Sequence, residues 1–97
     1  MTFGPWRALA ATSPPRTPGL LQARVAELVV YPRGKSAMVY YDGDDDVSQA
    51  FARLCAIVPP GADVRVRFAE CRAPAAELAR RLDDFAARFG SRPEWNR

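Results

Sequence analysis

The sequence predicts a small α+β domain with two layers, in which helices pack on one face of a small sheet. Two neighbouring runs rich in β-branched and aromatic residues, 20–31 and 37–43, flank a polar turn. The run VRVRF at 64–68 alternates apolar and basic side chains, as strands do. Residues 44–58 and 74–90 carry apolar side chains at helical spacing. The expected order is therefore β-hairpin, helix, strand, helix.

The first 17 residues are expected to form a proline-rich arm, and residues 18–97 the single domain that a chain of 97 residues holds. A short helical turn is expected around Trp6 to Ala11, followed by an extended linker. We expect Trp6 and Leu9 to dock on the core, because an exposed tryptophan leaves a large apolar surface in water.

The segment LLQARVAELVVY at 20–31 fits two structures. Leu21, Val25 and Leu28 follow helical spacing. The alternation at its start and the β-branched and aromatic residues of 29–31 favour a strand. We interpret it as a strand, with PRGKS as a turn and AMVYYDG as the return strand of a hairpin. A helix here would remove the hairpin.

The polar ends of the hairpin resemble two ligand-binding motifs. Gly34-Lys35-Ser36 matches the end of a phosphate-binding loop, but Val29 stands where that loop needs glycine, and a strand follows instead of a helix. The alternating aspartates of DGDDD resemble the start of a calcium loop, yet Val47 occupies the position that needs glycine. We interpret the two motifs as a hairpin turn and as negative charge at the start of a helix.

Both predicted helices have recognisable ends. Pro59-Pro60-Gly61 ends the first helix. The second begins at Pro74 and ends at Gly90. Four apolar side chains share one face of the second helix: Leu78, Leu82, Phe85 and Phe89.

The composition excludes several classes of function. The chain has no histidine, which removes every Ser-His and Cys-His nucleophile arrangement. No apolar run approaches the roughly 18 residues of a membrane span, and the N-terminus is a poor signal peptide. We therefore expect a cytoplasmic protein without a membrane partner. Cys55 and Cys71 are then expected to be buried free thiols.

Four basic residues are candidates for contact with nucleic acid. The net charge of +3 permits such contact without requiring it. Arg65 and Arg67 project from one side of the VRVRF strand, and Arg33 and Lys35 lie at the hairpin turn. A solvated sheet face that pairs with acidic side chains is the alternative for Arg65 and Arg67.

The element order and the closing segment FGSRPEWN together resemble the GIY-YIG nuclease domain over residues 18–97. Gly19-Leu20-Leu21 stands where that family has its first triplet, with Leu21 in place of a tyrosine. Tyr41-Asp42-Gly43 stands for the second triplet and keeps its tyrosine and glycine. The resemblance implies DNA as a partner, and magnesium as the cofactor of an active member.

The resemblance also implies roles for individual residues. Tyr41 and Arg53 would be catalytic, with Tyr41 activating a water and Arg53 stabilising the phosphate charge. Glu77 has the residue type of the family's metal ligand, whereas Asp84 fits its spacing best. Three acidic residues of the last helix are thus metal candidates: Glu77, Asp83 and Asp84. Asn96 would be the structural cap at the end of the domain.

We expect a GIY-YIG-like nucleic-acid-binding domain whose nuclease activity is degenerate or absent, because Leu21 replaces one tyrosine and no clear metal glutamate is present. The alternative is a small adaptor or regulatory protein that acts through protein contacts. Its exposed hairpin edge would accept a partner strand or a second copy of the chain. An active magnesium-dependent endonuclease is the third possibility.

Overall fold

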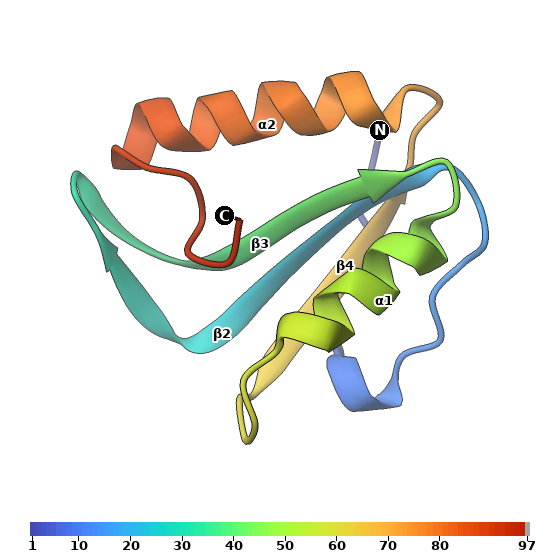
Figure 1. The fold of residues 1–97 in the computed structure, drawn as a ribbon, viewed down its shortest axis with the longest axis horizontal. Coiled ribbons are helices and arrows are strands. Elements are labelled where there is room, and N and C mark those ends of the chain that lie inside the picture. The colour runs from blue at the N-terminus through green and yellow to red at the C-terminus, as the bar shows by residue number, and fades with distance from the viewer. Residues whose placement is uncertain (97) are drawn as a thin grey trace.

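The computed structural model describes residues 1–96 and has the predicted α+β class (Figure 1). The order hairpin, helix, strand, helix is confirmed, and a short strand and a 3₁₀ turn precede it. The elements are β1 (Arg7–Ala8), η1 (Leu9–Ala11), β2 (Gly19–Tyr31), β3 (Gly34–Asp44), α1 (Val47–Ile57), β4 (Val64–Glu70) and α2 (Pro74–Phe89).

The four strands form one antiparallel sheet with the order β1-β4-β2-β3. β2 lies inside the sheet, between β4, which it pairs from Gly19 to Val25, and β3. The pairing with β3 continues to Tyr31, opposite Gly34, with register shifts on the way. The segment 20–31 is therefore a strand, as predicted.

Helix α1 covers one face of the sheet. Asp46 caps its N-terminus, where the carboxylate accepts a hydrogen bond from the Ser48 N–H at 3.0 Å. Such a cap satisfies one of the N–H groups that a helix leaves without partners. The buried core beneath α1 consists of Leu21, Ala23, Val39, Tyr40, Val47, Ala50, Leu54, Val64 and Val66.

Helix α2 packs against the opposite face. Cross-strand pairing places Gln22, Tyr41 and Arg67 side by side there, and Tyr41 meets Phe85 of α2 edge-on, with ring centroids 5.7 Å apart. The five consecutive residues 19–23 of β2 are buried, which requires cover on both faces. The sequence predicted both helices on one face, but the sheet lies between them. A helical apolar stripe shows which side of a helix is buried, not which face of a sheet it meets.

The proline-rich arm is part of the sheet. Its residues Arg7 and Ala8 pair with β4 as β1. Residues 9–11 form a 3₁₀ turn, so a strand and a tighter turn replace the expected helical turn over 6–11. Leu9 packs against the core, as expected. The following linker passes the start of α1, where the Thr17 carbonyl accepts a hydrogen bond from the Val47 N–H at 2.9 Å.

A C-terminal strap, residues 93–96, covers the outer edge of β3 (Figure 1). The Trp95 N–H donates to the Val39 carbonyl at 2.9 Å. The Asn96 side chain accepts from the Tyr41 N–H at 2.8 Å and donates to the Tyr41 carbonyl at 2.7 Å. One amide side chain thus takes the place of a partner strand, and a strand edge that would attract another chain is occupied.

Both cysteines are free, but neither is buried: Cys55 is exposed and Cys71 is half-buried. The expectation of buried thiols is therefore wrong. Cys55 follows the buried Leu54 on α1 and points away from the core. Across residues 1–96, no helix combines the length and the hydropathy that crossing a membrane would need.

Candidate nucleic-acid interface

The N-terminal arm runs along β4 at the edge of the sheet and directs two aromatic side chains over the face that α1 leaves open. The Gly4 N–H donates to the Phe68 carbonyl at 2.9 Å, and β1 continues this pairing along β4. The aromatic rings of Phe3 and Trp6 lie over this face, where both contact the Arg67 guanidinium. Both rings are half-buried there.

Three arginines and these two aromatic rings form an alternating stack, the arginine ladder. Its members are Arg24 of β2, Trp6, Arg67 of β4, Phe3 and Arg81 of α2. The guanidinium carbons of Arg24 and Arg67 lie 4.5 and 4.4 Å from the centre of the Trp6 ring. Those of Arg67 and Arg81 lie 4.8 and 5.1 Å from the centre of the Phe3 ring. At these distances each cation is attracted to the ring face.

Arg67 is the fixed centre of the ladder. Its Nε donates to the Gln22 side chain at 2.8 Å, and Gln22 is buried. Burial lowers the pKa of Arg67, and the neighbouring charges of Arg24 and Arg81 lower it further. The guanidinium still keeps its charge at neutral pH. The three arginines of the ladder therefore hold their positive charges close together despite the repulsion between them.

Tyr41 lies beside the ladder, in a cleft between β3 and α2. The cleft has a volume of about 250 Å³ and is lined by Tyr41, Arg80, Arg81, Asp84, Phe85, Arg88 and Phe89. Burial raises the pKa of the Tyr41 hydroxyl, while the charges of Arg81, Arg67 and Arg88 act in the opposite direction. The phenol therefore stays protonated at neutral pH and is able to donate a hydrogen bond to an anion.

The structure does not bring the two predicted catalytic residues together. Arg53 of α1 lies on the other side of the sheet, where its Nε contacts Asp42 at 2.8 Å and its Nη2 contacts Asp44 at 3.0 Å. The tyrosine next to it is Tyr40, whose hydroxyl donates to Asp42 at 2.8 Å. Tyr41 faces α2 instead.

Two of the three predicted metal carboxylates, Glu77 and Asp84, are already paired with arginines. Glu77 contacts both Arg80 and Arg81, and Asp84 contacts Arg80 at 3.2 Å. The hydrogen bond from Arg80 is the main cause of a lowered Glu77 pKa. Within residues 1–96, no three Asp, Glu, Cys or His side chains are grouped closely enough to hold a metal ion.

Of the four predicted nucleic-acid contacts, only Arg67 belongs to the ladder. Arg65 is exposed and lies 3.8 Å from Asp63. Arg33 donates to the Ala87 carbonyl at 3.3 Å, and Lys35 is exposed at the hairpin turn. Both therefore lie at the far end of the hairpin from β4.

Sequence reasoning missed four members of the ladder: Phe3, Trp6, Arg24 and Arg81. The expected docking of Trp6 was a partial signal, because it required an apolar or cationic surface beneath the ring. Gln22 and Arg24 were a second signal, because two residues at alternate positions of a strand place their side chains on the same face of the sheet. The sequence did not indicate that the arm pairs with β4 and directs its rings over this face.

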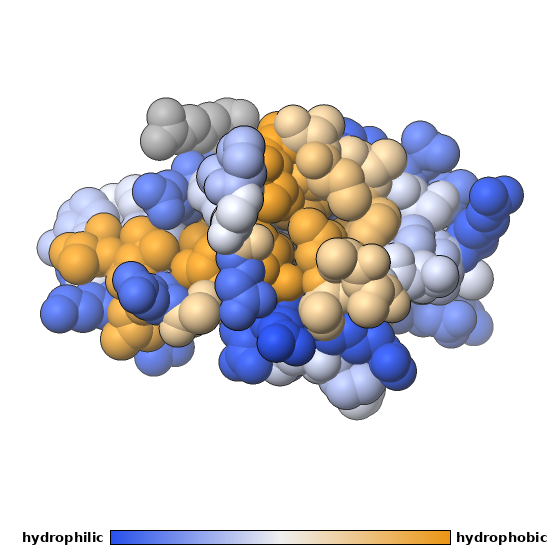
Figure 2. Space-filling view, turned by 90° about the horizontal axis from the view of Figure 1, so that it is seen from below, coloured by the Kyte–Doolittle hydropathy of each residue, from blue (hydrophilic) through white to orange (hydrophobic). Residues whose placement is uncertain are grey.

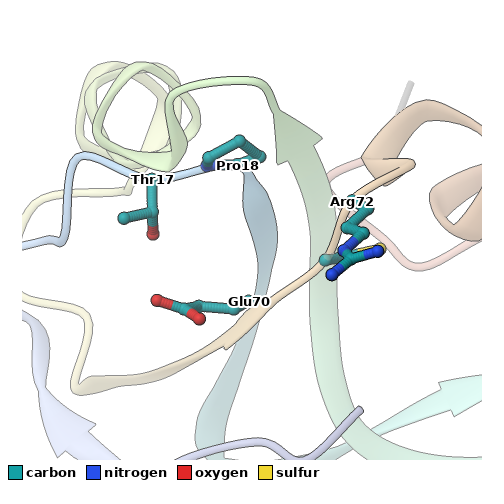
Figure 3. A pocket seen from close by; sticks show the side chains of 5 residues that line it. Thr17, Pro18, Glu70 and Arg72 are labelled. Atoms are coloured by element: carbon teal, nitrogen blue, oxygen red, sulfur yellow. The ribbon is translucent and has the colours of Figure 1, made fainter.

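A second hollow lies where the linker meets the end of β4 (Figure 3). It has a volume of about 410 Å³ and is lined by Thr17, Pro18, Glu70, Cys71 and Arg72. The Thr17 hydroxyl oxygen is buried and has no hydrogen-bond partner within residues 1–96. Glu70 and Arg72 are exposed, so this hollow is an open depression without the concentrated charge of the ladder.

Comparison of this chain with known protein families, with curated proteins and with solved structures finds no match.

Proposed function

We propose that this domain binds nucleic acid, with DNA as the first candidate, through the arginine ladder. The observation that carries the proposal is the set of three arginines from β2, β4 and α2 held side by side by Trp6 and Phe3. The resemblance of the sequence to GIY-YIG domains supports the same ligand. The two free thiols support a cytoplasmic location.

The ladder suits phosphate recognition because stacking occupies only the faces of the guanidinium groups. Their N–H edges keep their directions and can donate two parallel hydrogen bonds to phosphate oxygens. The aromatic rings reduce the freedom of the long arginine side chains, so less entropy is lost on binding.

We further propose that binding occurs without cleavage. The side chains of Tyr41 and Arg53 lie on opposite faces of the sheet, so they do not contact the same phosphate group. Glu77 is neutralised by two arginines, which opposes metal binding there. Plasmid DNA incubated with the protein and magnesium should therefore stay supercoiled. Nicking that disappears in Glu77→Gln or Asp84→Asn would overturn this part of the proposal.

The test of binding is fluorescence anisotropy with labelled single-stranded and double-stranded DNA over a series of salt concentrations. Three phosphate contacts predict a slope of log K against log salt of about −2 to −3. Arg24→Gln and Arg81→Gln should each weaken binding and reduce the slope by about 1. Both residues are half-buried and neither belongs to the hydrophobic core cluster, so the fold should survive.

Arg16→Gln is the matched control, because Arg16 is an exposed arginine of the linker outside the ladder. It removes the same net charge and should leave the slope nearly unchanged. Salt-independent binding, or equal effects of the Arg16, Arg24 and Arg81 substitutions, would show that the ladder is not the interface.

A further inference from the structure

The distal half of β2 has no strand on one of its sides. β4 pairs with β2 only from Gly19 to Val25, whereas β3 accompanies β2 on the other side up to Tyr31. Within residues 1–96, no strand lies on the β4 side of residues 26–31, which we call the open edge. An unpaired edge presents N–H and C=O groups that another strand can pair with.

The register shows which residues direct these backbone groups outward. Tyr31 and Gly34 close the two-residue turn of the hairpin, so they exchange hydrogen bonds with each other. Backbone direction alternates along an antiparallel strand, so Val29, which pairs with Ser36, also faces β3. Val30 lies between these two residues and therefore faces the open edge with both its N–H and C=O groups. Leu28 is the last residue of the stretch in which the register shifts, and it has no partner on β3.

The side chains of the same two residues are exposed hydrophobic groups. Leu28 is 63% exposed and Val30 is 73% exposed, more than any other large hydrophobic residue described. Figure 2 shows hydrophobic side chains gathered at the hairpin end of the molecule. Glu27 is the single charged residue between positions 26 and 31. Exposed edges are usually protected by charges or proline, and this one has little such protection.

We propose that two copies of this chain pair through their open edges as an antiparallel, two-fold symmetric dimer. When Val29 of one copy pairs with Val29 of the other, Leu28 of each copy lies opposite Val30 of its partner. Glu27 then lies opposite Tyr31, so no like charges face each other. A second copy is the occupant because the partner strand must be apolar at alternate positions, and this segment itself has that pattern.

The strip is short compared with standard protein–protein interfaces, so the dimer is weak. Sedimentation equilibrium at protein concentrations from about 10 µM to about 1 mM, without nucleic acid, should follow the rise from monomer to dimer.

Two substitutions of opposite charge test the proposed pairing register of the dimer. Leu28→Lys and Val30→Glu each place a charge in the apolar strip and should weaken self-association at least about tenfold. Mixing the two variants places the new lysine opposite the new glutamate and should restore a dimer. Both sites are exposed, so circular dichroism of each variant should match that of the unchanged protein.

Ile57→Lys is the control, because Ile57 is also an exposed hydrophobic residue but belongs to α1. It should dimerise as the unchanged protein does. A monomer at every concentration would overturn the proposal. So would a dimer that survives both edge substitutions, a mixture that stays monomeric, or a loss of the dimer in Ile57→Lys.

Discussion

Replacing Asn96 by alanine removes the two side-chain hydrogen bonds between the C-terminal strap and β3, and leaves the bond from the Trp95 N–H to the Val39 carbonyl. The Asn96 amide accepts from the Tyr41 N–H at 2.8 Å and donates to the Tyr41 carbonyl at 2.7 Å. No other group of residues 1–96 forms a hydrogen bond across this edge at Tyr41. The substitution therefore leaves one donor and one acceptor of the backbone without their partner.

The expected loss of unfolding free energy is about 1–3 kcal/mol, because a typical intramolecular hydrogen bond contributes about 0.5–1.5 kcal/mol. Water reaches this half-buried edge and keeps the loss below the penalty of full burial. For a domain of this size, the melting temperature should fall by roughly 4–8 °C for each kcal/mol. Urea unfolding followed by circular dichroism gives the free energy, and calorimetry gives the temperature.

Ser91→Ala is the control for the strap region. The Ser91 hydroxyl donates only to the neighbouring Arg92 carbonyl, in an exposed position, so its loss should change stability by less than about 0.5 kcal/mol. If Asn96→Ala unfolds at the same urea concentration as Ser91→Ala, the strap does not hold the edge of β3 and this reasoning fails.

Three further changes test the core, the sheet and a surface ion pair. Leu54→Ala, at a fully buried site under α1, should cost about 2–5 kcal/mol in urea unfolding, and a cost below about 1 kcal/mol would contradict the packing described. Gly19→Ala would place a methyl group 2.5 Å from the Ala69 carbonyl oxygen, so its melting temperature should fall, and an unchanged value would contradict the strand spacing. The Arg80 contact lowers the Glu77 pKa below its usual 4.5, so the pair stabilises the fold above that pH and loses this effect as pH falls. Carboxyl NMR titration should show the pKa rising in Arg80→Gln, and an unchanged pKa would exclude the pair.

The elements of the fold were predictable where one short segment contains the whole signal. VRVRF alternates, and the structure buries Val64 and Val66 while Arg65 stays exposed. β1 was not predictable because its two residues become a strand only by pairing with β4. Helix α2 covers the second face of β2. The only sign of this cover lies in residues 19–23 of β2, which are all buried in the structure.

The candidate site was less predictable because it depends on which of two adjacent tyrosines faces which helix. Neighbouring strand residues point to opposite faces, so one tyrosine had to meet α1 and the other α2. The register decides this, since Tyr40 pairs with Ala23 and Tyr41 with Gln22. Tyr40 therefore joins Asp42 and Arg53, and the expected partnership of Arg53 with Tyr41 does not form.

The way the ladder is stabilised supports the proposed binding of an anionic partner. Acidic side chains would neutralise three arginines most directly, yet in the described part of the chain only Glu77 forms an ion pair with a ladder member, Arg81. Arg24 and Arg67 are held by aromatic rings and one neutral amide, which keep them in place without cancelling their charge. Positive charge that is fixed but not neutralised lowers the energy of any phosphate that approaches this face.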